Sequence, residues 1–186
     1  MRWNFSPDKN SRVLLSGFVL SGSALLAACV PHKQTGYLEI GNRLDFRQLV
    51  SQHGAPFGDL SKVHLVVYAD SMAGNRMVHR VFTEFSTACF DSGSVAFVGD
   101  VSGMPSFVTR LAAVPLMQSY TYPVWLDYDG SATQNIPVLE DQVSLITVED
   151  GRMVSIGYAH TDEGISNALV KYCVKESAKT QTASAP

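Results

Sequence analysis

The feature that most constrains the fold is a continuous apolar run, VHLVVYA at residues 63–69, which is followed by a short turn and a helical pattern. A run of β-branched residues without alternation is typical of a strand that is buried on both faces. The next stretch, residues 76–90, places Met77, Val81 and Phe85 at helical spacing, so that one stripe faces a sheet. This pattern predicts a strand, a tight turn and a helix.

The chain continues to alternate between strand-like and helix-like periods up to residue 174. Pro105 suits the first turn of a helix, and Asp150-Gly151 suits the turn of a β-hairpin. We therefore expect strands, helices and a hairpin in the order β-α-β-α, hairpin, helix. The expected elements are a buried strand at 94–101, a helix at 105–117, an extended segment ending in a turn at 122–130, a hairpin at 143–158 and a closing helix at 162–174.

The first 28 residues are typical of an export signal. Arg2, Lys9 and Arg12 precede VLLSGFVLSGSALLAA, an apolar stretch that is short and rich in Gly and Ser for a membrane span. The stretch ends in LAAC, which resembles the lipobox of bacterial lipoproteins. The resemblance implies that Cys29 becomes the first mature residue and carries several acyl chains, which anchor the protein stably. The alternatives are an ordinary secretory signal and an uncleaved anchor that happens to contain a cysteine.

The residues after Cys29 and the charge balance bear on location and partners. Val30 and Pro31 stand where an aspartate would favour the inner membrane in enterobacterial-type sorting, so we expect the periplasmic face of the outer membrane. The whole chain has 14 Lys and Arg against 17 Asp and Glu, and the signal holds three of the former and one of the latter. The mature chain is therefore acidic, which predicts neither nucleic-acid binding nor a polybasic patch for anionic lipid.

The composition divides the chain into four parts. Within the second part, the stretch RLDFRQLVSQHG at residues 43–54 predicts a short amphipathic helix, stopped by Gly54 and Pro56. The end of the chain is small, polar and without pattern, so we expect it to be disordered. The predicted parts are a signal peptide at 1–28, a tether with a short helix at 29–58, a single folded domain at 59–174 and a disordered tail at 175–186.

The folded part resembles the thioredoxin family. Residues 68–77, YADSMAGNRM, align without a gap on the family's W-A-E-W-C-G-P-C-K-M stretch, with Met72 and Asn75 at the two cysteine positions. Downstream, YPVWLDYDGSA and VSLITVEDGRMVSIGYAH are similar to membrane-tethered thiol-disulfide oxidoreductases. The resemblance covers roughly residues 60–174 and implies an α/β, thioredoxin-like three-layer fold, with a central mixed sheet flanked by helices. It also places Val143 where the family has a cis-proline.

These replacements remove the family's chemistry. Thiol-disulfide exchange needs a thiolate, which the family stabilises at a helix N-terminus. Met72 has no ionisable proton, and Asn75 cannot resolve a mixed disulfide. A cis bond before a non-proline residue costs about 2.5–4 kcal/mol, so we expect a trans bond before Val143 and a reshaped groove. The sequence thus predicts a degenerate redox site with no catalytic residue and no cofactor.

Two further cysteines, Cys89 and Cys173, fall near the ends of the first and last predicted helices. The thioredoxin resemblance implies that these two helices pack side by side on one face of the sheet. A structural disulfide between Cys89 and Cys173 is therefore one hypothesis, and an oxidising periplasm favours it. The alternative is a pair of separate buried thiols that act as small hydrophobes.

The sequence contains one candidate group of soft metal ligands and one group of aromatic residues. Met72, Met77 and His79 crowd the degenerate site with soft ligands of the kind copper prefers, but methionine at helical spacing is more often core, so we expect no metal. The aromatic group at 120–128 predicts two core residues and two at the rim, or else a contact surface. The histidines, which show no paired metal spacing, are His32, His53, His64, His79 and His160.

Three functions fit this sequence. The first is a redox-inactive, lipid-anchored binding or scaffolding component whose partners are other envelope proteins, for example in a secretion or conjugation apparatus, by analogy of architecture. The second is an accessory or chaperone in periplasmic thiol or metal-centre assembly, such as that of cytochromes or copper sites. The third is an active oxidoreductase that uses Cys89 or Cys173.

Overall fold

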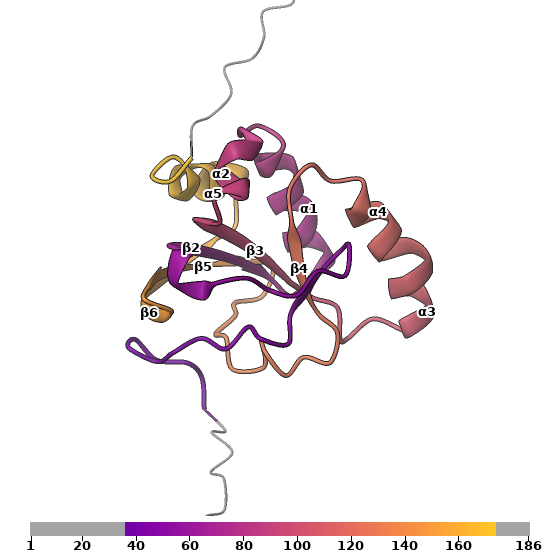
Figure 1. Ribbon diagram of the computed structural model, residues 1–186, viewed down its shortest axis with the longest axis horizontal. Coiled ribbons are helices and arrows are strands. Elements are labelled where there is room, and N and C mark those ends of the chain that lie inside the picture. Colours follow the sequence, from indigo (N-terminus) through magenta and orange to yellow (C-terminus); the bar gives the residue numbers. More distant parts are fainter. Residues whose placement is uncertain (1–35, 174–186) are drawn as a thin grey trace, which may run out of the picture. The chain divides into compact units, whose positions relative to one another are not determined.

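A six-stranded mixed sheet forms the centre of the computed structural model, which describes residues 36–173 (Figure 1). The predicted signal peptide, Cys29 and the tail from Lys175 lie outside the described residues. The strand order is β1-β4-β3-β2-β5-β6. The strands are β1 (Val50–Ser51), β2 (Leu65–Ala69), β3 (Val95–Asp100), β4 (Val124–Asp127), β5 (Val143–Glu149) and β6 (Arg152–Ala159).

Strand directions give the sheet two distinct edges. Strands β2, β3 and β4 are parallel, whereas β5 is antiparallel to β2 and β6 is antiparallel to β5. Tyr68 near the end of β2 pairs with Ser144 near the start of β5. The three parallel strands therefore end, and β5 begins, at one edge, which we call the carboxyl edge.

Each face of the sheet has its own apolar core. In β2, Leu65 and Val67 face the helices, and Val66 and Tyr68 face the other way. This alternation explains the continuous apolar run, because both faces of the strand are buried. The helices are α1 (Met72–Phe82), α2 (Thr87–Asp91), α3 (Ser106–Val108), α4 (Val114–Gln118) and α5 (Asp162–Leu169).

The face opposite α1 is covered by the N-terminal segment, residues 38–62, and the predicted helix at 43–54 is wrong. This stretch contains turns and β1, which pairs with β4. Leu44, Phe46 and Leu49 are buried in the same core as Val66. Contact with the sheet therefore outweighs local helical propensity. Much of the predicted tether is part of the folded core.

The first predicted helix is interrupted before Cys89. Helix α1 ends at Phe82, and α2 begins at Thr87. The Thr83 hydroxyl donates a hydrogen bond to the Arg80 carbonyl at 2.7 Å, and such local bonds compete with continued helix. Cys89 consequently lies in α2 and not at the end of one long helix.

The second predicted helix is present over residues 106–118, and its middle is widened. A π-helical segment, Thr109–Ala113, joins α3 to α4. Pro115 lacks an N–H and would clash with the carbonyl four residues earlier in a regular α-helix, and the wider turn accommodates it. Pro105 precedes the first helical residue.

No helix within residues 36–173 is long and apolar enough to cross a membrane.

The predicted hairpin and closing helix are both present. Asp150 and Gly151 have φ values of 48° and 75°, the positive values that a two-residue hairpin turn needs. Helix α5 ends at Leu169, earlier than predicted, and Thr161 caps its start by accepting a hydrogen bond from the Gly164 N–H.

Candidate functional site

The start of α1 lies at the carboxyl edge, directly after β2. Ser71 caps the helix, because its Oγ accepts a hydrogen bond from the Gly74 N–H at 3.1 Å. The Ser71 carbonyl accepts one from the Asn75 N–H at 2.9 Å. Met72 is the first helical residue, and its side chain is 55% exposed. Helix α1 thus begins directly after β2, with the thioether of Met72 in the outward position.

Asn75, at the second cysteine position, turns into the protein. Its Nδ2 donates a hydrogen bond to the Ser71 carbonyl at 2.9 Å. Its Oδ1 is buried without a hydrogen-bond partner and lies over Gly99 of β3, where an added Cβ would be 3.3 Å away. A buried acceptor without a partner is unfavourable by about 1–3 kcal/mol. The Asn75 side chain is therefore held by packing and offers no reactive group.

Val143, at the cis-proline position, fills the space beside the first turn of α1. It is completely buried, and its Cγ2 lies 3.5 Å from where a Cβ on Gly74 would be. No peptide bond among residues 36–173 is cis, so the bond before Val143 is trans. The branched side chain closes this position, and of the three residues at the degenerate redox site only Met72 is exposed.

Large exposed apolar side chains lie near several of the strand ends at the carboxyl edge. Phe107 lies in α3, which follows β3, and it is 65% exposed. Tyr128 follows the last residue of β4 directly, and Val138 and Leu139 lie just before β5. Because all these strand ends share one edge, the side chains belong to one end of the molecule. We call Met72, Phe107, Tyr128, Val138 and Leu139 the carboxyl-edge apolar group.

Aspartates also mark the carboxyl edge, and the most buried of them has a structural role. Asp127, only 2% exposed, ends β4. Its Oδ1 accepts a hydrogen bond from the Gly130 N–H, and its Oδ2 accepts from the Ala132 N–H and from the N–H and hydroxyl of Thr133, all at 2.9–3.0 Å. Asp127 therefore organises the loop at 128–133. Within residues 36–173, no three His, Cys, Asp or Glu side chains are placed to hold a metal ion.

His79 belongs to an aromatic cluster and does not converge with the methionines. Its Nδ1 is 2.6 Å from the Tyr122 hydroxyl, and its ring stacks on Tyr120 at 4.0 Å. Burial lowers the pKa of His79 and raises the pKa of Tyr122. Met77 packs against the core beneath α1, whereas Met72 is exposed. The structure does not bring these three potential soft ligands together.

The aromatic residues at 120–128 divide between core and surface. Tyr122 is fully in the core, and Tyr120 and Trp125 are partly buried against the two cores. Tyr128 is 47% exposed. The contact surface expected from this stretch is thus reduced to Tyr128.

The two remaining cysteines lie at the other end of the sheet. Cys89 in α2 and Cys173 after α5 are joined by a disulfide, with Cα atoms 5.1 Å apart. Both are 7% exposed. Helix α2 leads into the start of β3, so the disulfide lies opposite the carboxyl edge. This pair is buried and far from the position of a redox centre.

Sequence reasoning missed two parts of this arrangement. The role of Asp127 was contained in the pattern Asp-x-Asp-Gly directly after a strand, since aspartate often binds backbone N–H groups in a following turn. The packing of the N-terminal segment on the sheet had only a weak signal, the alternation of Leu44 and Phe46.

Together, the mixed sheet and the helix that begins at the end of β2 define an α/β, thioredoxin-like fold. The fold class expected from the sequence is confirmed. No protein-family model and no curated protein matches the chain.

Among solved structures, the chain is similar to a putative protein disulfide isomerase from Bacteroides thetaiotaomicron, at 16% sequence identity and a TM-score of 0.50 over 73% of this chain and 89% of that one. It is also similar to a putative thiol:disulfide interchange protein DsbE from Chlorobium tepidum, at 9% identity and a TM-score of 0.49 over 73% and 98%. A thio-disulfide isomerase from Thermus thermophilus is 20% identical, with a TM-score of 0.46 over 73% and 97%. At these identities the similarity shows the fold alone.

Proposed function

We infer that this protein is a redox-inactive, thioredoxin-like lipoprotein of the bacterial envelope that binds other envelope proteins and acts as a scaffolding component of a multi-protein complex, such as a secretion or conjugation apparatus. Cys29 is its lipid anchor. The carboxyl-edge apolar group is its contact surface.

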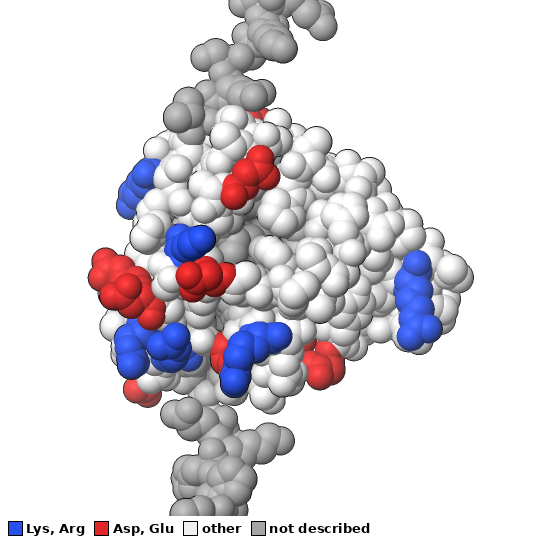
Figure 2. Space-filling model, in the orientation of Figure 1, with Lys and Arg blue, Asp and Glu red and all other residues white. Residues whose placement is uncertain are grey.

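The observation that carries this proposal is the composition of the carboxyl edge. Met72 and Phe107 are more than half exposed there, and Tyr128, Val138 and Leu139 are 38–47% exposed, whereas buried apolar side chains fill both cores of the folded domain. Exposed apolar groups that gather at one place are typical of contact sites. The helical segment that contains Phe107 is also poor in charge: residues 101–126 contain one charged side chain, Arg110, and Figure 2 shows few charges over α3 and α4. Acidic side chains, Asp129 and Glu140 among them, adjoin the other members of the group. Such a surface suits a protein partner.

The same edge lacks the groups that an oxidoreductase needs. Met72 and Asn75 replace the thiols, and the Asn75 amide oxygen is turned inward over Gly99. The only disulfide among the described residues is buried at the opposite end of the sheet. Exchange would require Cys89 or Cys173 to become exposed, which the packing around α2 and α5 opposes.

Two observations support an envelope location. The LAAC sequence ending at Cys29 resembles a lipobox, with Val30 and Pro31 favouring the periplasmic face of the outer membrane. A structural disulfide suits an oxidising compartment, because cytosolic disulfides are rare.

The experiment is photo-crosslinking in the native host, with a photoreactive amino acid placed at Met72 or at Leu139 in the full-length chain. Val170 is the matched control, because it is 53% exposed, close to the 55% of Met72, and lies at the end of α5 away from the carboxyl edge. We expect one discrete adduct with another envelope protein from Met72 and Leu139, and none from Val170.

Three results would contradict the proposal. Equal adducts from all three positions would show non-specific contact, and no adduct from Met72 and Leu139 would remove the contact surface. Disulfide exchange by the purified protein, at a rate comparable to a thioredoxin, would replace the scaffold role with an enzymatic one. The anchor is tested separately by the mass of the mature protein, where absence of acyl chains on Cys29 would exclude it.

A further inference from the structure

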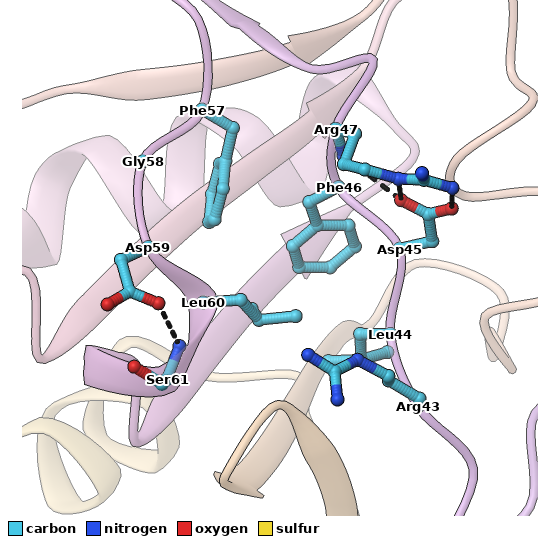
Figure 3. Close-up of a pocket in the computed structure, with 10 residues that line it drawn as sticks. All are labelled: Arg43, Leu44, Asp45, Phe46, Arg47, Phe57, Gly58, Asp59, Leu60 and Ser61. Atoms are coloured by element: carbon cyan, nitrogen blue, oxygen red, sulfur yellow. Dashed lines mark hydrogen bonds and ion pairs between the residues drawn. The ribbon is translucent and has the colours of Figure 1, made fainter.

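The N-terminal segment contains a cavity that belongs to none of the sequence motifs. Two stretches, residues 43–47 and 57–61, lie beside each other and enclose about 590 Å³ (Figure 3). Cavities of roughly 300–1,000 Å³ are typical of small-molecule sites. Two of its lining residues, Leu60 and Arg43, lie beside Gly151 in the β5–β6 turn, which is at the opposite edge of the sheet from the carboxyl-edge apolar group. It is therefore a separate site.

The walls of the cavity combine polar and apolar side chains, and packing holds the apolar ones in place. Leu44 and Phe46 are each 2% exposed, and Phe57 and Leu60 are partly buried against the same core. The Phe57 ring lies edge-on to Phe46 at 5.3 Å and to Trp125 at 4.8 Å. These contacts hold both phenyl rings without a ligand, so the wall is preformed.

The hairpin turn lies beside two residues that line the cavity. A Cβ on Gly151 would lie 3.4 Å from Leu60 Cδ2 and 3.8 Å from a terminal nitrogen of Arg43. The guanidinium of Arg43 therefore lies near Leu60, and Figure 3 shows it extending toward the space between the two stretches.

Of the charged groups around the cavity, Arg43 is the one whose side chain makes no hydrogen bond or ion pair, although its charge, after that of Arg47, helps to lower the pKa of Asp45. Arg47 binds Asp45 through two hydrogen bonds, of 2.8 and 2.6 Å, and lowers the pKa of that carboxyl. Asp59 accepts a hydrogen bond from the Ser61 N–H at 2.9 Å. Within residues 36–173, no hydrogen bond or ion pair engages the Arg43 side chain. Its five N–H donors are available to a ligand.

We propose that this cavity binds a monocarboxylate with an aromatic or branched apolar body, through a bidentate contact to Arg43. The planar guanidinium matches the two oxygens of a carboxylate, and Phe46, Phe57 and Leu60 receive the apolar body. The nearby Asp45 and Asp59 carboxylates repel a dianion such as a phosphate monoester. A free organic acid and the last residue of a peptide share this chemistry.

The test is calorimetric titration of the full-length chain carrying Cys29→Ala, which prevents lipidation. The probes are 3-phenylpropionate and its uncharged amide, and acetyl-glycyl-phenylalanine with a free or an amidated carboxyl end. We expect saturable binding of both acids, with the amides weaker by about tenfold. If 3-phenylpropionate binds more tightly than acetyl-glycyl-phenylalanine, the site is assigned to small organic acids. If the peptide with the free carboxyl end binds more tightly, the site is assigned to a chain terminus.

Arg43→Gln is the decisive variant, because the side chain is exposed and its loss leaves the core intact. It should weaken both acids by about tenfold and leave the amides unchanged. Arg110→Gln, with the same change of charge on the distant helix, should bind as the parent does, and circular dichroism checks that both variants fold. Equal binding of acid and amide, no effect of Arg43→Gln, or no saturation up to about 10 mM ligand would overturn the proposal. None of these results bears on the crosslinks from Met72.

Discussion

The two ends of the sheet differ in how far their sulfur-containing and apolar side chains are exposed. At the carboxyl edge, a helix starts as in a redox enzyme, but its outward residue is Met72 and the surrounding apolar side chains are exposed. At the other end, Cys89 and Cys173 are bonded to each other and almost fully buried. The difference indicates that the cysteines of the folded domain stabilise it, whereas in the function that we propose the start of α1 makes contacts with a partner.

The largest expected effect comes from restoring thiols at the carboxyl edge. The double variant Met72→Cys/Asn75→Cys places a thiol in the first turn of α1, where the helix dipole favours the thiolate. We expect exchange with a small disulfide substrate at least tenfold above the parent protein. The measurement is the rate of that exchange, with Met77→Cys as a control on the same helix. An inactive double variant would show that the trans bond before Val143 or the packing, and not the missing thiols alone, prevents the chemistry.

The disulfide is expected to dominate stability at the other end. Its cysteines are 84 residues apart, and closing a loop of that length stabilises the fold by about 2–4 kcal/mol. The variant Cys89→Ala/Cys173→Ala should lose this amount in urea denaturation and keep its crosslinks from Met72. Loss of the crosslinks in a variant that still folds would show that the two ends are coupled.

Substitution of Asp127 tests how much the loop at the carboxyl edge contributes to the free energy of unfolding. Asp127→Ala leaves one buried and two partly buried N–H groups and the Thr133 hydroxyl without their acceptor, so we expect the free energy of unfolding to fall by about 2–3 kcal/mol. Asp129→Ala, an exposed neighbour in the same loop, should change it by less than about 0.5 kcal/mol. Equal effects of the two variants in denaturant titrations would mean that Asp127 does not organise the loop.

The smallest expected effect is a pH dependence at His79. Burial lowers its pKa below the ordinary value of 6.5, so the unfolded chain binds a proton more readily than the folded one. The contribution to stability is complete above about pH 6.5 and decreases as the pH falls from there toward the folded-state pKa. His79→Gln can keep a hydrogen bond to Tyr122 without titrating. Its denaturation midpoint should therefore fall less than that of the parent between about pH 7 and 5, and identical profiles would contradict this assignment.

The elements that were predicted well are those in which local and tertiary preferences agree. The run at 63–69 is β-branched and buried on both faces, and Asp150-Gly151 adopts the positive φ values that its composition favours. The start of α1 directly after β2, with Ser71, Met72 and Asn75 in its first turn, was also predictable, because it follows from the position of β2 in the chain.

The wrong secondary-structure predictions fall where contacts between residues far apart in the sequence determine the local conformation. The stretch at 43–54 has helical periodicity, but it packs on a face of the sheet that would otherwise be exposed. Burial of Leu44, Phe46 and Leu49 on that face favours an extended path. The break between α1 and α2 has the same origin, since it allows Phe85 and Phe90 to reach the core. Neither of these contacts leaves a periodic signal in the local sequence.

The sequence by itself determined the order of strands and helices from residue 63 onward and the absence of a thiol pair at the start of α1, because each depends on residue type at a local position. Only the tertiary structure decided that the N-terminal segment closes the second face of the sheet, that Asp127 organises a loop, that Cys89 meets Cys173, and that Arg43 lies beside a cavity without a hydrogen bond or ion pair. These features join residues far apart in the chain. Their partners are selected by packing and hydrogen bonding in three dimensions, which local periodicity does not encode.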